Sequence, residues 1–559
     1  MLSDQTILCV KNIIPIYGFF RFYGVVRKLA VIVLYVTILI ICAVAFIGKV
    51  HASNVCKVEV AWIVSIQGTI EVRRVQQRQQ IWQPVTPDTV LCLGDMIRSR
   101  THSRATLRLA NESFLNLNQK SSMTFLPANE EKKSFLMQLL EGVIHIITRT
   151  PKPFDVTTPF VNASVHGTEF LVEATEENSR VVVYEGKVAV TNDYGSVVLN
   201  DREAATASQY QAPQKTIPIH PTDAVQWALY YPTLATYWPR EDTDAPGTIA
   251  SIQQASDALI VGQADEAKSV IARVLRREPG NSDAHSLLAI IAVTQNDKEA
   301  AYDFARQAVT FNPQSAVAYI ALSYTQQARF EIEEALTSIR KSLKIDAHNA
   351  LVWARLAELQ MSSGELEQAL VSAQQAVQFN PNLAKTQTVL GFAHLLQIDT
   401  QMAKHTFNQS IALDSADPMP RLGLGLALIR EGQLEAGRVQ LEIAASLDPA
   451  NSLIRSYLGK AYFEERRYPH ASTQFDLAKE RDPKDPTPWL YDAIQKQTQN
   501  RPIEALQDIQ KSIALNDNRA VYRSKFLLDR DEAARGSSLA RIFETLGFER
   551  RAVMETAKS

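Results

Sequence analysis

A position that ends helices recurs every 34 residues through the C-terminal half of this chain. Proline occupies it in five of eight repeats. Proline stops a helix because it lacks an N–H donor and clashes with the preceding turn. The position is held by Pro279, Pro313, Ala347, Pro381, Ser415, Pro449, Pro483 and Asp517. A sustained period of this length predicts helical hairpins stacked into a solenoid, which offers a long surface rather than a catalytic pocket.

Two columns of small residues keep the same period, 12 and 24 residues before each terminator. Small side chains at fixed points let paired helices approach closely. The columns are Ala267, Ala301, Ala335, Ala369, Ala403, Gly437, Ala471 and Ala505, and Ala255, Ala289, Ser323, Ala357, Gly391, Gly425, Gly459 and Ala493. Residues 248–519 therefore resemble eight tetratricopeptide repeats. The aromatic position that opens the first helix of such a repeat holds Trp353 and Trp489, but His285, Gln387 and Arg421 elsewhere.

An apolar segment near the N-terminus predicts a membrane anchor. Residues 29–48 carry no charge, and 20 residues suffice to cross a hydrocarbon core of about 30 Å. Arg21, Arg27 and Lys28 precede the segment, so residues 1–28 should form a short cytoplasmic tail. A signal peptide cleaved after Ala52 is the rival interpretation. We favour the uncleaved anchor, because signal cores usually have about 7–15 apolar residues. Both alternatives place the bulk of the chain outside the cytoplasm.

Composition adds two expectations. The net charge of −2 gives no overall basic bias, so we expect no nucleic-acid partner. The four cysteines form no metal-binding spacing. Cys56 and Cys92 follow the apolar segment and could form a disulfide if that side of the membrane is oxidising; two unpaired cysteines are the alternative.

Residues 58–200 change from helical to alternating periodicity. Short runs rich in strand-forming residues occur at Ala105–Leu109, Phe114–Leu117, Val143–Ile147 and Val181–Tyr184. Glycine and asparagine turns separate them. This pattern predicts an all-β domain.

Four motifs in this region occur in the order of a FecR domain. They are Leu93–Ser99, Ala105–Asn111, Val165–Phe170 and Tyr184–Val188. The region therefore resembles the FecR family, whose domains are periplasmic and relay signals or mediate contacts. The family's usual arginine before Gly-Thr is replaced by His166. The resemblance implies a fold and a compartment rather than iron signalling. Residues 1–28 are too few for a cytoplasmic anti-sigma region, and a proline-rich linker, residues 201–247, leads straight into the repeats.

No catalytic or nucleotide-binding motif is present, so we expect neither enzymatic activity nor a cofactor or metal site. We expect an apolar groove along the first helices of the repeats to bind a protein or peptide partner. The predicted groove residues are Ile320, Tyr324, Phe392, Leu395, Leu422, Leu426, Ile429 and Phe463. Packing of these residues against neighbouring repeats, or against the β domain, is the alternative. Residues 520–559 should form an incomplete terminal helical repeat.

The sequence thus predicts a multidomain chain with a single transmembrane helix, an all-β FecR-like domain and an α-helical solenoid. Its expected role is that of a non-enzymatic envelope scaffold at the inner membrane. A FecR-like transmembrane signalling regulator is one alternative. A cell-wall-associated enzyme or glycan binder is another, and a buried acid–base cluster in the β domain would favour it.

Overall fold

The computed structural model describes residues 58–75, 81–129, 134–148, 154–165, 169–216, 247–516 and 531–558, without residues 261, 296 and 330. All described residues belong to one compact unit, Val58–Ser559. The expected tail, residues 1–28, and the expected anchor, residues 29–48, lie outside the described residues. From residue 58 onward, none of the described helices has the length and apolar character needed to cross a membrane.

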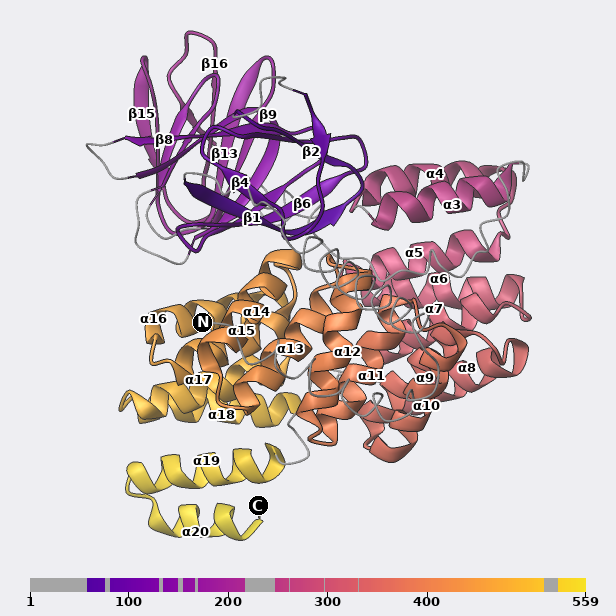
Figure 1. The fold of residues 1–559 in the computed structure, drawn as a ribbon. Helices are drawn as coiled ribbons and strands as arrows, with labels where there is room; N and C mark the ends of the chain where they lie inside the picture. Colours follow the sequence, from indigo (N-terminus) through magenta and orange to yellow (C-terminus); the bar gives the residue numbers. More distant parts are fainter. Residues whose placement is uncertain are drawn as a thin grey trace, which may run out of the picture. The chain divides into compact units, whose positions relative to one another are not determined.

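The strands follow one another before any described helix (Figure 1). They are β1 (Glu59–Gln67), β2 (Ile70–Arg73), β3 (Gln83–Pro84), β4 (Val90–Cys92), β5 (Met96–Ser99), β6 (Arg104–Leu109), β7 (Phe114–Leu117), β8 (Ser122–Asn129), β9 (Ser134–Ile147), β10 (Phe154–Thr157), β11 (Asn162–Val165), β12 (Glu169–Ala174), β13 (Asn178–Glu185), β14 (Val188–Asn192), β15 (Gly195–Leu199), β16 (Ala204–Ser208) and β17 (Gln214–Thr216).

Strand pairing produces two sheets that share β9. One sheet has the order β4-β1-β6-β7-β9-β12-β13-β16-β17. The other has the order β3-β2-β5-β8-β9-β10-β11-β14-β15. Strand β9 changes sheets at Gly142, whose φ is +95° and whose missing Cβ would lie 2.2 Å from Ser121 Oγ. Glycine is required at such a bend because it alone tolerates both conditions.

Apolar residues from both sheets form one buried cluster, which includes Ile63 and Leu107 of the first sheet and Ile97 and Phe125 of the second. The domain is therefore two sheets packed over a shared core, as alternating strands predict. It also continues beyond the expected boundary at residue 200. Strand β16 pairs with β13, and β17 pairs with β16, so the first part of the linker predicted for residues 201–247 contributes two strands to the sheet, the last of which ends at Thr216. Residues 217–246 lie outside the described residues.

Sixteen described helices form eight antiparallel pairs in chain order (Figure 1). They are α3 (Thr248–Ile260), α4 (Ala264–Arg277), α5 (Ser282–Thr294), α6 (Lys298–Phe311), α7 (Ala316–Ala328), α8 (Ile332–Ile345), α9 (Ala350–Ser363), α10 (Leu366–Phe379), α11 (Ala384–Leu396), α12 (Thr400–Leu413), α13 (Pro418–Arg430), α14 (Leu434–Leu447), α15 (Ser452–Glu464), α16 (Tyr468–Arg481), α17 (Pro486–Thr498) and α18 (Pro502–Asn516).

Local chemistry explains where these helices begin and how closely they pair. Two residues after most terminators, an Asn, Asp or Ser side chain accepts a hydrogen bond from the first helical turn. Asn281, for example, accepts from the Ala284 N–H. The column of small residues 24 positions before each terminator permits close packing. At Gly391, for example, a Cβ would lie 2.6 Å from the Phe407 ring on the partner helix.

A further hairpin, α19 (Asp531–Thr545) and α20 (Glu549–Lys558), follows the eighth pair. Leu539, Ile542 and Phe543 of α19 share a buried cluster with Leu490 and Ile509 of the eighth pair. The helices predicted within residues 520–559 therefore pack onto the end of the repeats. Residues 520–530 lie outside the described residues.

Candidate protein-interaction site

A row of polar side chains crosses the outer face of the first sheet. Thr106 of β6 is opposite Asn116 of β7, which is opposite His145 of β9. Their chain neighbours point the other way, into the shared core, as strand geometry requires. Polar residues on an outer face are normally solvated, yet Asn116 is 4% and His145 0% exposed. Another part of the protein must therefore cover them.

Helix α14 covers this row. Asn116 Nδ2 donates to the Ser446 carbonyl at 2.9 Å, and Thr106 Oγ1 donates to Asn116 Oδ1 at 2.8 Å. Beside them is an apolar cluster formed by Val64, Phe114 and Ile147 from strands and by Val439, Ile443 and Leu447 from α14. The helical members are four residues apart, so they occupy one stripe of α14. The β domain and the sixth repeat thus share a buried interface.

A buried ion pair extends this interface to α15. Arg455 Nη2 lies 3.2 Å from Glu169 Oε1 and 3.1 Å from Glu169 Oε2. Arg455 Nε also donates to the Pro449 carbonyl at 3.0 Å, and Nη1 donates to Gln474 Oε1 at 3.0 Å. His145 Nε2 lies 3.2 Å from Glu169 Oε1. Because both charges are buried, removing either partner would leave the other charge uncompensated and would destabilise the interface.

The same residues form the buried acid–base cluster that would favour an enzyme. His145 and Tyr184 have ring centroids 5.8 Å apart. Burial, together with the negative charge of Glu169, raises the pKa of the Tyr184 hydroxyl above its usual range. Glu169 is held by Arg455, and His145 is fully buried. The cluster therefore stabilises the interface and is closed to a substrate. No group of three metal-ligating side chains occurs among the described residues.

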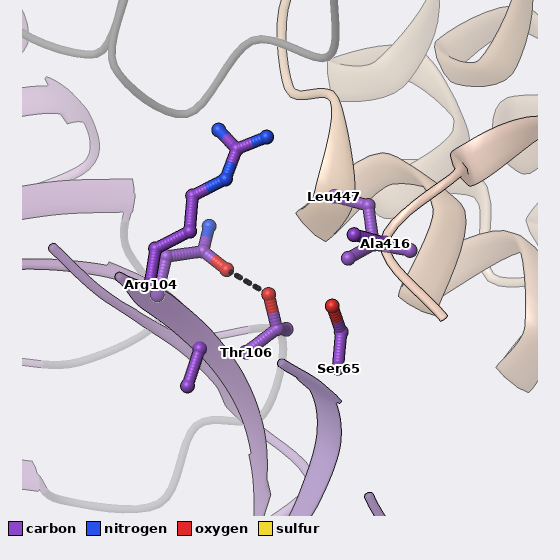
Figure 2. A pocket seen from close by; sticks show the side chains of 7 residues that line it. Ser65, Arg104, Thr106, Ala416 and Leu447 are labelled. Carbon is purple, nitrogen blue, oxygen red and sulfur yellow. Dashed lines mark hydrogen bonds between the residues drawn. The ribbon is translucent and has the colours of Figure 1, made fainter. Parts of the chain in front are cut away.

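A small void remains within the interface. Figure 2 shows Ser65, Arg104 and Thr106 projecting from the strands, while Ala416 and Leu447 lie on the opposite side. Its volume of about 20 Å³ is enough for one water molecule. The void is therefore too small for an organic ligand.

Two arginines that lie beside the β domain occupy the aromatic position of the repeat. Arg421 and Arg455 stand six residues after their terminators, as does Trp353. At this position the side chain generally donates to the carbonyl of the terminator. Trp353 Nε1 donates to the Ala347 carbonyl at 2.8 Å, and Arg455 does the same to Pro449. Arg455 thus keeps the structural role and adds a charge that reaches Glu169 of the β domain, whereas Arg421 Nη1 donates to Gln440 Oε1 instead.

The helical side of this interface was not predicted from the sequence, although the repeats contain a signal for it. The position of Ile443 is polar and faces outward in most other repeats. Its equivalents are Arg273, Gln307, Lys341, Gln375, Gln409, Leu477 and Lys511. Comparison within this column would have identified Ile443 as a covered residue.

Four of the eight predicted groove residues are buried. Ile320, Phe392, Leu395 and Leu422 are at most 6% exposed and belong to the solenoid core. Phe392, for example, packs edge-on against Phe407 with ring centroids 4.9 Å apart. The expectation that these four residues line an open groove is therefore wrong.

The other four predicted groove residues, Tyr324, Leu426, Ile429 and Phe463, are partly exposed, and their binding of a partner stays a prediction.

Tyr324 packs against both an apolar cluster and a group of charged residues. The Arg355 guanidinium lies 3.8 Å from the Tyr324 ring centroid and forms an ion pair with Glu358 at 2.9 Å. Lys385 also pairs with Glu358. Burial alone would raise the pKa of Glu358, but the charges of Lys385 and Arg355 hold it below its usual range. Arg355 and Glu358 are each 2% exposed, so this charged group is a buried part of the repeats rather than a surface for a partner.

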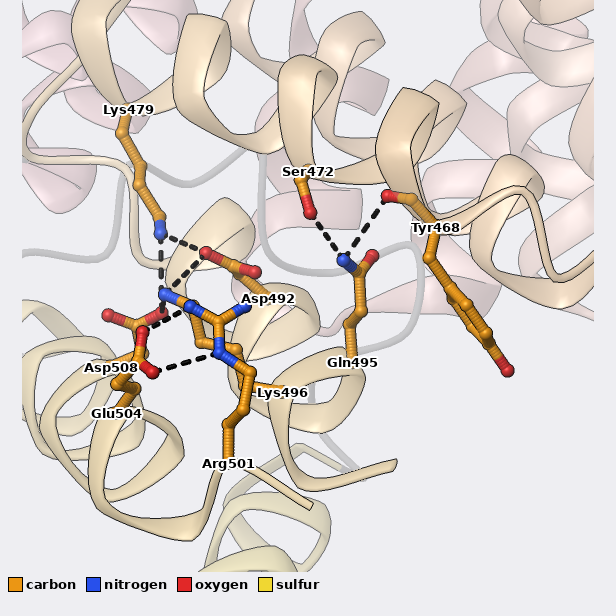
Figure 3. A network of polar contacts seen from close by, with 9 residues as sticks. All are labelled: Tyr468, Ser472, Lys479, Asp492, Gln495, Lys496, Arg501, Glu504 and Asp508. Atoms are coloured by element: carbon orange, nitrogen blue, oxygen red, sulfur yellow. Dashed lines mark hydrogen bonds and ion pairs between the residues drawn. The ribbon is translucent and has the colours of Figure 1, made fainter. Parts of the chain in front are cut away.

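A second charged network joins the last two repeats (Figure 3). Lys496 bridges Asp492 at 2.9 Å and Asp508 at 2.6 Å, and Lys479 reaches both carboxylates from the preceding repeat. Burial raises the pKa of Asp508. The two lysines outweigh burial at Asp492 and lower its pKa. Two ammonium groups thus neutralise two carboxylates, so the network is a structural joint rather than a binding site.

Comparison with known families agrees with the motifs. Residues 95–189 match the family model described as FecR protein, and residues 252–316 and 422–486 match the model described as tetratricopeptide repeat. The chain therefore carries a FecR-type domain and tetratricopeptide repeats. Both are non-catalytic interaction or regulatory domains, which supports a role in protein interaction or as a signalling adaptor. The motif residues 166–168, including His166, lie outside the described residues. No curated protein matches the chain.

Solved structures share parts of this fold. A chain of the APC/C hetero-tetramer Cut9–Hcn1 has 18% identity and a TM-score of 0.43, covering 55% of this chain and 58% of that one. This chain thus spans less than two thirds of that chain. The pilF protein of Pseudomonas aeruginosa has 25% identity and a TM-score of 0.28, covering 37% and 94%. YrrB, a repeat protein with an unusual peptide-binding site, has 20% identity and a TM-score of 0.23, covering 32% and 92%. With scores this low, these likenesses carry no functional argument.

Proposed function

We propose that the protein is a non-enzymatic scaffold that binds a protein or peptide partner through its repeats and its FecR-type domain. The observation that carries this proposal is the interface itself. Helices α14 and α15 already bury the outer face of a folded β domain by means of Ile443, Leu447 and Arg455. A repeat surface that recognises one folded domain so specifically is suited to recognising another protein surface.

The proposed location is the inner membrane, with the repeats in the periplasm. Three observations support it: the apolar segment at residues 29–48, the FecR-type domain, and a disulfide at Cys92. Disulfides persist mainly in oxidising compartments. Cys92 is the one cysteine among the described residues, so its partner, for which Cys56 is our prediction, lies outside them. A C-terminal alkaline phosphatase fusion should be active, and an inactive but stable fusion would contradict this location.

The partner should contact the partly exposed members of the predicted groove. A photocrosslinking amino acid at Leu426 or Phe463 tests this in the full-length chain, and Val371 on α10 is the control because it is 59% exposed outside the predicted groove. We expect the same discrete product from both groove positions and none from Val371. The product must also disappear when the other groove position carries glutamate. Equal products from all three positions, or none, would refute the groove.

Signalling is the second candidate function, and the FecR-type domain favours it. In that case residues 1–28 should bind a cytoplasmic protein. Purification of the chain with and without these residues decides the matter, because a scaffold keeps its partners after their removal and a signalling regulator loses a cytoplasmic one.

A further inference from the structure

A larger cleft opens beside the buried interface. It has a volume of about 460 Å³ and lies between strands β1 and β6 and helices α13 and α14. Trp62, Val439 and Ile443 give it apolar walls. Arg108 and Arg421 supply its positive charge. The cleft is therefore of the size that holds a small organic group or a few residues of peptide.

The two arginines of the cleft have unused hydrogen-bonding capacity. Arg421 Nη1 donates to Gln440 Oε1 at 2.8 Å, but its Nε is buried and has no partner in the described part of the chain. Neither Arg421 nor Arg108 forms an ion pair with a described residue. At the same repeat position, Arg455 uses its Nε for the Pro449 carbonyl and its Nη2 for Glu169. Arg421 thus lacks both contacts that Arg455 makes, the one to the terminator carbonyl and the one to a carboxylate.

The electrostatics of the cleft indicate which anion fits. Burial lowers the pKa of Arg421, and the negative charge of Asp88 opposes this effect. A partly desolvated guanidinium gains most from a carboxylate, whose two oxygens match its planar donors. Exposed Asp88 and Glu112 at the rim balance the two arginines. That balance disfavours a doubly charged phosphate and permits a single negative charge.

We propose that this cleft binds a carboxylate of a peptide segment, with Arg421 and Arg108 as donors and an adjoining apolar side chain against Trp62, Val439 and Ile443. The inference rests on the proposed function and names the chemistry of the partner. Because the walls come from both the β domain and the sixth repeat, the bound peptide contacts the two together.

Peptide binding to the full-length chain tests the proposal. The probes are fluorescently labelled Gly-Gly-Leu-Phe with a free carboxylate, the same peptide as its amide, and the amide of Gly-Glu-Leu-Phe. Fluorescence polarisation should show at least one carboxylate probe binding about tenfold or more tighter than the uncharged amide, since hydrogen bonds to charged groups are stronger than those between neutral groups. The probe that binds tells whether a chain terminus or an acidic side chain is recognised.

Arg421→Gln is the decisive variant, because Gln387 occupies the same repeat position and donates to the Pro381 carbonyl at 2.8 Å, so the substitution suits the fold. It should remove the difference between acid and amide. Arg430→Gln, an exposed change on the same helix, should leave it intact.

Equal binding of acid and amide, a response to Arg430→Gln equal to that of Arg421→Gln, or no carboxylate binding up to about 1 mM overturns the proposal. Crosslinks from Leu426 and Phe463 would persist in each of these outcomes if the scaffold function itself is correct.

Discussion

The ion pair between Glu169 and Arg455 should decide how tightly the β domain holds the repeats. Removing one member of a buried pair leaves an uncompensated charge and costs about 3–5 kcal/mol. Arg455→Gln is the suitable change. Gln387, at the same repeat position, donates to its terminator carbonyl at 2.8 Å, so the variant can keep the corresponding contact while losing the charge. The interface is then weakened without disturbing the start of α15.

A cysteine at residue 446 measures the separation. Ser446 is 1% exposed. Its backbone carbonyl accepts the hydrogen bond from Asn116 Nδ2, so Ser446→Cys preserves that contact. A thiol reagent reacts only with the opened state, and the labelling rate follows the population of that state when closing is fast. A cost of 3–5 kcal/mol corresponds to an increase of about 100-fold or more in labelling rate at pH 7. The chain that keeps Ser446 gives the background from native cysteines, and the Ser446→Cys chain is the parent of every other variant.

Two further variants make the result specific. Arg355→Gln removes a different buried pair, with Glu358 inside the repeats, and should leave labelling at residue 446 unchanged. Glu169→Leu combined with Arg455→Met should label nearly as slowly as the parent, because replacing both charges with apolar groups is often neutral or stabilising. If Arg455→Gln labels within about twofold of the parent, the pair contributes nothing to the interface and the reasoning is refuted.

Three other changes have defined outcomes. Ile443→Gln, which installs the residue found at Gln409, should also speed labelling at residue 446, because burying the isoleucine is worth about 1.5–3 kcal/mol; an unchanged rate would mean that α14 does not hold the sheet. Gly391→Ala should destabilise the repeats by about 1–3 kcal/mol in urea unfolding, since its Cβ would lie 2.6 Å from the Phe407 ring; full stability would show that the ring moves freely. Burial, with a contribution from a neighbouring carboxylate, raises the pKa of Asp417 from 3.8 to about 7. Its folded form therefore binds more protons, and stability falls as the pH rises from about 4 to 7. Asp417→Asn keeps a good helix cap and should recover up to about 4 kcal/mol at pH 8 and almost nothing at pH 4, measured by urea unfolding; a gain independent of pH would contradict the assignment.

The elements of this fold were predictable because their signals are local. Terminators and caps mark the helices within a few residues, as Pro279 and Asn281 do before α5. The alternating runs at 105–109 and 114–117 became β6 and β7 for a similarly local reason. The extent of the β domain was less accessible. Strand β16 reads AATAS, a small-residue segment whose strand character comes from pairing with β13 rather than from propensity.

The predicted groove failed at half of its residues for a geometric reason. The groove residues were predicted from their spacing to the small residue of each first helix, which places them on the inner side of that helix. The same side also packs against the second helix of the pair. Phe392 therefore meets Phe407 rather than solvent. The interface with the β domain was hidden differently, because Asn116 and Ser446 are 330 residues apart and each looks like an ordinary surface residue in its own element.

Residues at equivalent positions of the repeats can be compared with one another, and this comparison shows what a given position requires of its side chain. The position six residues after each terminator needs only a side chain that bonds the preceding loop, a role that Trp353 and Gln387 perform without charge. Arginine there carries a cost when it is covered, because a guanidinium must be desolvated. At Arg455 the compensation is visible in Glu169, 286 residues earlier in the chain. Arg421, in the preceding repeat and beside the same sheet, forms no ion pair with a described residue, and the charge of Asp88 offsets its burial only in part. The same physical requirement at both positions indicates that a carboxylate from outside this part of the chain completes the second one.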